Sequence, residues 1–275
     1  MSYVEKDWES RDSRVIIKDK YHTQRYSPTT PLVKERRKKS TSASTAQQIM
    51  INMRHRTDRL NRLILDNFSA GDWWVTFTIS KQVSLEKFKD AYEKMMRKLR
   101  DEYRKLGAEL KYITVKENIN GKGRLHGHML LPNIAFTELQ RILKKAWKLG
   151  NCNIKPYGGT ALDAKQLASY ITKEDTAETK LLKRIKAEKD KADKETLKKL
   201  DEDIKAERSS ICTSRNLIRR EPKKRIVKRA ETYSDAPRAP KGYHIVKQLS
   251  YSGYTADGYP YQHTVFERGD QTCIH

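Results

Sequence analysis

The chain has few cysteines and no long apolar stretch. Its 275 residues include three cysteines, Cys152, Cys212 and Cys273, at wide spacing and without a CxxC pair. This excludes a disulfide framework and a cysteine-based zinc site, so we expect free thiols. No run approaches the about 18 apolar residues of a membrane helix, and the first residues lack the apolar core of a signal peptide. We therefore expect a cytoplasmic protein.

Acidic residues are also scarce relative to basic ones. The chain has 58 Lys+Arg against 35 Asp+Glu, a formal net charge of +23. Such an excess favours nucleic acid as the partner, because neutralising phosphates releases their condensed counterions. A solvated basic surface that only keeps the protein soluble is the alternative.

Composition divides the chain into four segments. Residues 1–44 are polar and basic and predict a flexible arm. Residues 45–175 have the apolar periodicity of a folded core. Residues 176–210 are rich in Lys, Glu and Asp and predict a charged helical insertion, for which a solvated face is the simplest interpretation. Residues 211–275 predict a β-hairpin region that completes the core.

The core segment predicts an α+β fold, an antiparallel β-sheet with flanking helices. Strands are expected where β-branched and aromatic residues alternate, and helices where apolar residues recur every three or four positions. We expect helices at 45–68, 84–107, 137–147 and 160–173, and strands at 73–80, 112–118, 124–131 and 152–154. An Asn-Gly step joins the second and third strands as a hairpin, and Thr137 with Gln140 resembles a capping box.

His126 and His128 lie two positions apart in an expected strand, so their imidazoles point to the same side of the sheet. Glu117, near the end of the neighbouring strand, can face the same side. Two imidazoles and a carboxylate suit Mn²⁺ or Mg²⁺ with positions left open for phosphate oxygens. The alternatives are two half-buried structural histidines and a surface carboxylate.

Tyr170 and Lys173 are three residues apart on the last expected helix and share a face. A tyrosine near a metal can attack a phosphodiester, and an ammonium can lower the tyrosine pKa or balance phosphate charge. Taken alone, the pair is more typical of packing.

Three motifs follow one another along the chain in this order: the strand FTIS, His126-Gly127-His128 and Tyr170-x-x-Lys173. On these motifs the chain resembles the HUH endonucleases, specifically the rolling-circle replication initiators of small plasmids and single-stranded DNA phages. The resemblance covers residues 73–174. It implies that His126, His128 and Glu117 bind the divalent metal, and that Tyr170 forms a 5′-phosphotyrosine. Lys173 would balance charge. Two departures are Gly127, where the family has a hydrophobic residue, and Glu117, which is matched only by position.

The same resemblance favours replication over conjugation, because the tyrosine follows the histidines; relaxases have it near the N-terminus, and transposases share the order found here. With one tyrosine in the motif, strand joining requires a homodimer or a second cycle. The chain has no G-x-x-x-x-G-K-[ST] loop, so helicase and polymerase would come from the bacterial host. Single-stranded or hairpin origin DNA is the expected substrate.

Several basic residues are candidates for contacting that DNA. They are Arg54, Arg56, Arg59, Arg62, Lys122, Arg124, Arg215, Arg219 and Arg220. Two other functions fit the same features: a non-catalytic DNA-binding repressor or packaging protein, in which the histidines are structural, and a hydrolytic metallonuclease that leaves no phosphotyrosine.

Overall fold

The computed structural model describes residues 3–20, 46–118, 123–173, 182–187, 195–200, 210–227, 234, 236–254 and 260–269. The chain forms two units: residues 46–219 make a central unit, and the two ends, 1–45 and 220–275, make a terminal unit. Each has an antiparallel sheet, and helices flank the sheet of the central unit, so the expected α+β class is confirmed.

Five strands form the sheet of the central unit, in the order β6-β3-β5-β4-β7. They are β3 (Trp73–Thr78), β4 (Ile113–Glu117), β5 (His126–Leu131), β6 (Cys152–Pro156) and β7 (Ser210–Thr213). All pairings are antiparallel, and β4 pairs with β5 as the Asn-Gly step predicted. The turn itself lies outside the described residues.

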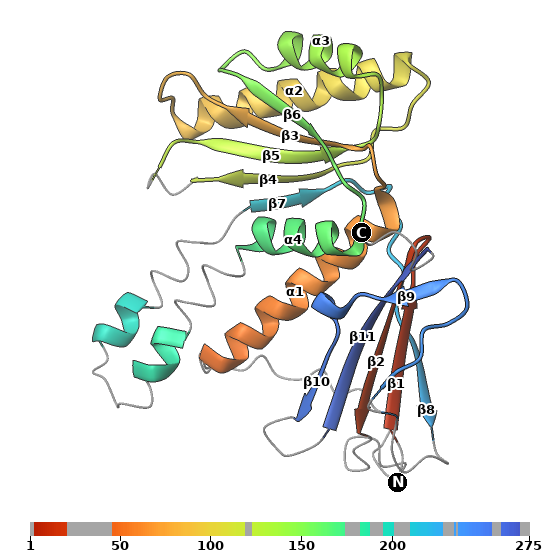
Figure 1. The fold of residues 1–275 in the computed structure, drawn as a ribbon. Coiled ribbons are helices and arrows are strands. Elements are labelled where there is room, and N and C mark those ends of the chain that lie inside the picture. Colours follow the sequence, from red (N-terminus) through yellow and green to blue (C-terminus); the bar gives the residue numbers. More distant parts are fainter. Residues whose placement is uncertain are drawn as a thin grey trace, which may run out of the picture. The chain divides into compact units, whose positions relative to one another are not determined.

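Four helices accompany this sheet: α1 (Ala46–Asn67), α2 (Leu85–Lys105), α3 (Phe136–Ala146) and α4 (Ala161–Thr172). Figure 1 shows α2 and α3 on one side of the sheet and α4 on the other. Ser84 caps α2 by accepting a hydrogen bond from the backbone of Lys87. The predicted capping box of α3 is wrong, because this helix already begins after Ala135 and has no side-chain cap.

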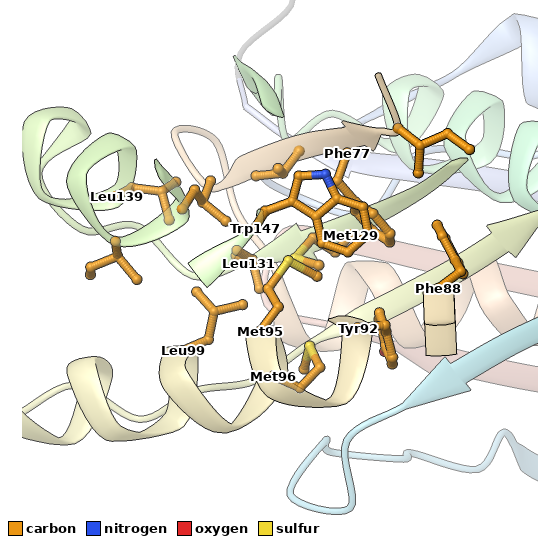
Figure 2. Packing of buried hydrophobic residues seen from close by; sticks show 14 of the residues in the cluster. Phe77, Phe88, Tyr92, Met95, Met96, Leu99, Met129, Leu131, Leu139 and Trp147 are labelled. Carbon is orange, nitrogen blue, oxygen red and sulfur yellow. The ribbon is translucent and has the colours of Figure 1, made fainter. Parts of the chain in front are cut away.

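The hydrophobic core lies between the sheet and the pair α2 and α3. Alternate strand residues, among them Val75, Phe77 and Met129, face the apolar stripe of α2, and all three are fully buried. Trp147 follows α3 and packs edge-on against Phe77, with ring centroids 5.0 Å apart (Figure 2). The stripe in 84–107 is therefore core, as its spacing predicts.

On the other side of the sheet, α1 packs against α4. The buried hydroxyls of Thr57 and Thr172 lie 2.7 Å apart, and Nζ of Lys165 lies 3.1 Å from a carboxylate oxygen of Asp58. These polar contacts fix α4 against α1, and α4 carries the predicted nucleophile.

The terminal unit joins both ends of the chain in one sheet, with the order β10-β11-β2-β1-β8 and with β9 also paired to β11. Its strands are β1 (Tyr3–Glu9), β2 (Ser13–Lys20), β8 (Lys223–Val227), β9 (Tyr243–Ile245), β10 (Tyr251–Tyr254) and β11 (Pro260–Arg268). Trp8, Val15 and Phe266 are buried in its core.

This sheet corrects two expectations about the ends of the chain. Residues 3–20 are a β-hairpin rather than a flexible arm, because β11 and β8 pair with its two strands. The C-terminal hairpin, β10 with β11, exists as predicted, but its partners lie in this second sheet and not in the sheet of the central unit. The rest of the predicted arm, residues 21–44, lies outside the described residues.

In the predicted charged insertion, residues 182–187 and 195–200 are helical, and most of the remainder lies outside the described residues. Cys152 and Cys212 are free thiols, as expected, and Cys273 is not described. Among the described residues, no helix combines the length and apolarity needed to cross a membrane.

Candidate metal and nucleophile site

Glu117, His126 and His128 meet on the sheet face opposite the hydrophobic core. Strand register brings them together, because β4 and β5 place Glu117 directly opposite His126. Nε2 of His126 lies 3.4 Å from one carboxylate oxygen, and Nε2 of His128 lies 3.6 Å from the other. One ligand atom from each residue lies within 4.8 Å of the others. The three residues predicted to bind a metal are therefore grouped as a metal site requires.

The second nitrogen of each imidazole has its own partner. Nδ1 of His126 lies 3.0 Å from the carbonyl oxygen of Arg124, which can only accept, so Nδ1 carries the proton. Nδ1 of His128 lies 2.9 Å from the hydroxyl of Thr76. Nε2 of each histidine therefore faces Glu117. In metal sites, hydrogen-bond partners of the other ring nitrogen commonly orient the imidazoles in this way.

The Glu117 carboxylate fits a bound cation. Its side chain is 3% exposed, and within the described part of the chain Oε1 accepts no hydrogen bond. A buried charged oxygen without a partner is costly, and a cation beside it removes that cost. A carboxylate and two imidazoles are donors that Mn²⁺ accepts, and Mg²⁺ favours the oxygen among them.

Tyr170 reaches this group from α4. Its hydroxyl lies 2.9 Å from Nε2 of His128, and its side chain is 49% exposed. The helix begins with a capping box, in which Thr160 and Asp163 satisfy each other's backbone N–H groups. A capped helix therefore places the hydroxyl of a half-exposed tyrosine beside the candidate metal ligands.

Lys173 ends α4 beside the same carboxylate. Its Nζ lies 2.6 Å from Oε2 of Glu117, and its backbone is left-handed, with φ 56° and ψ 39°. Helices often end with a residue in this conformation, and here Lys173 is the C-cap of α4. Tyr170 and Lys173 thus reach different members of the group, although the sequence predicted only that they share a helix face.

The site's charges shift its pKa values. Burial opposes ionisation of Glu117, but hydrogen bonds from His126 and Lys173 outweigh it and lower the carboxyl pKa to about 2. Burial lowers the pKa of His128, whereas the hydrogen bond with Glu117 raises that of His126. Burial, and then the charge of Glu117, raise the pKa of Tyr170. A negative carboxylate and a neutral His128 are the forms that bind a metal.

Gly127, the departure from the family pattern, has a steric explanation. A Cβ at this position would overlap the ring of Phe77, which lies opposite it on β3, and would lie 2.7 Å from the carbonyl oxygen of Val115. The ring of Phe77 thus fills the core space beneath the two histidines.

Three residues at the site were not singled out from the sequence. The Trp74 ring stacks on the His128 imidazole, with centroids 5.2 Å apart and planes 1° from parallel, and Thr76 bonds the same imidazole. Both share the face of β3 that neighbours His128, so strand alternation was the available signal. Asn118 donates to the Arg124 carbonyl from a left-handed conformation, with φ 57°, and nothing local indicated its role.

Four of the predicted DNA-contacting arginines lie on α1. Arg54, Arg56 and Arg59 are exposed, and Arg62 is half-buried. The helix therefore presents a basic surface, as the sequence predicts.

The other predicted DNA contacts are dispersed. The guanidinium of Arg124 donates to the carbonyl of Ile79, and that of Arg219 donates to the carbonyls of Ser214 and Leu217. Arg215 is exposed, whereas Arg220 belongs to the terminal unit and donates to the Glu9 carbonyl. Lys122 lies outside the described residues. Arg124 and Arg219 thus hold loops in place, a role that the sequence did not indicate.

Comparison with known proteins gives one match. No curated protein and no solved structure matches the chain. Residues 72–175 match a family model described as replication-associated protein. The matched segment begins one residue before β3 and ends two residues after Lys173, so it contains all the residues of the candidate site. This match supports a role for the protein as a replication initiator.

Proposed function

We propose that this protein is a rolling-circle replication initiator of the HUH kind, which nicks single-stranded origin DNA by transesterification on Tyr170. The observation that carries the proposal is the 2.9 Å contact between the Tyr170 hydroxyl and His128, within the Glu117, His126 and His128 group. Structural histidines explain the strand motif but give no reason for an exposed tyrosine hydroxyl to lie against a candidate ligand.

In the proposed reaction, Oη of Tyr170 forms a bond to phosphorus and the bond from phosphorus to the 3′ oxygen breaks. The tyrosine proton is lost to solvent, and the leaving 3′ oxygen gains one, so the products are a 5′-phosphotyrosine and a free 3′-hydroxyl. That hydroxyl can prime DNA synthesis. The reaction conserves the phosphodiester energy, which permits later strand joining without another cofactor.

Glu117, His126 and His128 would hold the divalent cation, Mn²⁺ or Mg²⁺. When bound, the cation would polarise the scissile phosphate and stabilise its developing charge. Lys173 holds the Glu117 carboxylate in place and offsets its charge near Tyr170. The exposure of Tyr170 lets a single strand approach the hydroxyl, and the α1 arginines would bind its phosphates. Host helicase and polymerase would supply unwinding and synthesis.

The test uses a pool of single-stranded oligonucleotides with a randomised central region, labelled at the 3′ end. The protein is incubated with the pool and Mn²⁺, with and without EDTA, and the products are separated under denaturing conditions. We expect a labelled protein–DNA adduct that depends on metal and is absent for Tyr170→Phe. With 5′-labelled DNA, the released fragment should be extended by a polymerase, since it carries a 3′-hydroxyl.

The alternative functions give different products. A hydrolytic metallonuclease would cut in the presence of metal without an adduct, and Tyr170→Phe would still cut. A DNA-binding repressor or packaging protein would bind the oligonucleotides without cutting them. Either result would overturn the proposal.

A further inference from the structure

The central unit has a basic groove on the side of the sheet opposite the candidate site. It lies along α2 and α3 and encloses a volume of about 500 Å³. Five lysines line it, together with one acidic residue and three apolar ones. The lining residues are Lys87, Asp90, Ala91, Lys94, Lys98, Lys145, Ala146, Lys148 and Leu149. We refer to it as the lysine groove.

Most of its positive charge is not neutralised within the protein. Lys98 pairs with Glu102 at 3.3 Å, and Lys148 donates to the carbonyl of Lys144. Lys87, Lys94 and Lys145 are exposed and have no ion pair among the residues that the structure describes. Asp90 is the one acidic residue among the nine that line the groove, against five lysines. Bringing these cations together without a counter-charge is unfavourable, so the groove is complementary to a polyanion.

The spacing of the lysines suits an extended ligand. Lys87, Lys94 and Lys98 follow one face of α2 at intervals of seven and four residues, and span about 16 Å along the helix. Lys145 and Lys148, near the end of α3 and just after it, line the other wall. At one phosphate per about 3.4 Å of strand, this length corresponds to roughly five base pairs of a duplex.

The groove lacks groups that would read or stack bases. None of its lining residues is aromatic. Proteins that bind single strands combine cations with aromatic platforms, whereas contacts to duplex DNA mostly reach phosphates and position the protein without reading sequence. A lysine-lined groove without aromatic rings therefore suits the backbone of a duplex, in which the bases are already stacked on one another.

We propose that the lysine groove binds the phosphate backbone of double-stranded DNA, as a second DNA contact distinct from the candidate nicking site. The central unit would then hold duplex on its α2 and α3 side while Tyr170 acts on a single strand at the opposite face of the sheet. The inference goes beyond the proposed nicking function and needs only that the protein handles DNA.

The experiment compares two triple variants of the full chain that remove the same charge. The groove variant carries Lys87→Gln, Lys94→Gln and Lys145→Gln, and the control variant carries Lys183→Gln, Lys186→Gln and Lys198→Gln. All six side chains are exposed, so both variants should fold, as circular dichroism would verify. Binding to a 25-base-pair duplex and to a single strand of equal length is measured by fluorescence anisotropy over a series of salt concentrations.

We expect the groove variant to bind the duplex more weakly, with the slope of log affinity against log salt reduced by about 2 to 3, because each lost phosphate contact removes about 0.9. The control variant should keep the slope of the unmodified protein. An unchanged slope in the groove variant, or equal reductions in both variants, would overturn the proposal. An equal loss for the single strand would overturn its assignment to duplex.

Adduct formation on single-stranded DNA is measured for the same groove variant. It should match the unmodified protein, because no groove lysine belongs to the candidate site. Absence of adduct in both proteins would count against the proposed nicking function and leave the duplex result standing, so the two proposals can fail separately.

Discussion

The two faces of the five-stranded sheet in the central unit share the same strands but differ in chemistry. On one face, Val75, Phe77 and Met129 are fully buried against α2 and α3. On the other, His126, His128 and Glu117 meet beneath Tyr170 of α4. The period-two alternation of a strand makes this division possible, because neighbouring residues point to opposite sides.

The comparison teaches that one face is mostly apolar, whereas the other combines the buried apolar residues Ile113, Val115 and Leu130 with the candidate site. Burial of apolar side chains stabilises the fold by about 25 cal/mol per Å². Burial of a carboxylate such as Glu117 has a desolvation cost that only partners can offset. Substitutions on the two faces should therefore have separable effects, and the five predictions below test that separation from the largest expected effect to the smallest.

Replacing Tyr170 by Phe removes one hydroxyl and leaves the ring in place. We expect complete loss of the covalent DNA adduct, because the substitution removes the hydroxyl that would form the bond to phosphorus. The free energy of unfolding should change by no more than about 1 kcal/mol, the value of one hydrogen bond. Tyr112→Phe, a half-buried tyrosine outside the site, is the matched control and should keep the adduct.

Replacing Glu117 by Gln keeps the shape of the side chain and removes its charge. We expect Mn²⁺ affinity to fall by more than the about 10 to 100-fold that is typical when a partner of a ligand is lost, because here a ligand itself is changed. The electron paramagnetic resonance signal of free Mn²⁺ measures this. Glu86→Gln, an exposed residue at the start of α2, should bind metal normally. Equal affinity in both variants would argue against the site.

Replacing Leu99 by Ala acts on the opposite face. Leu99 is fully buried in α2, so we expect the free energy of unfolding to fall by about 2 to 5 kcal/mol. Denaturant titration measures this loss. Mn²⁺ affinity of the folded protein should be unchanged. A marked loss of metal binding would show that the two faces are not separable.

Gly127 lies between the two histidines in sequence, and a Cβ at this position would meet the ring of Phe77 on the core side of the sheet. A substitution here therefore tests both faces. We expect Gly127→Val to destabilise the protein by about 1 to 3 kcal/mol through overpacking. Adding Phe77→Leu should recover part of that loss in a double-mutant cycle, because a smaller side chain leaves room for the new methyl groups. Additive effects of the two substitutions would contradict this steric explanation.

Replacing Thr57 by Val breaks the hydroxyl contact between α1 and α4. Thr172 still donates to the carbonyl of Ala168, so the loss should be about 1 kcal/mol, measured by denaturant titration. Adduct yield should fall only slightly. Complete loss of adduct with a normally folded protein would mean that this contact positions Tyr170 more strictly than expected.

Much of the central unit could be predicted because its signals are local. The apolar stripe of α2 and the Asn-Gly step between β4 and β5 each lie within a short stretch of sequence. The proximity of Glu117 to His126 could be predicted as well, since alternation and the hairpin place the two residues side by side. The hydrogen bond of Asn118 depends on a left-handed backbone conformation, and the neighbouring residues do not predict that conformation.

The terminal unit could not be predicted in the same way. β2 pairs with β11, so that Val15 lies opposite Val265, and no local pattern indicates pairing across such a separation. Four of the seven residues of Tyr3–Glu9 are charged, and the segment was expected to belong to a polar arm. It forms a strand because β2 and β8 pair with it on both sides. Long-range pairing also has a large entropic cost that a sequence pattern does not display.

That pairing has a consequence for synthesis on the ribosome. The β1 and β2 hairpin is translated before the central unit, whereas β8 and β11 are translated after it. The central unit, whose strands all precede residue 219, can complete its sheet while the hairpin still waits for its partners. The order of translation therefore allows the terminal sheet to form only after the strands of the central unit have been made, and a protein truncated before β11 would have a formed central unit and an unpaired β2 edge.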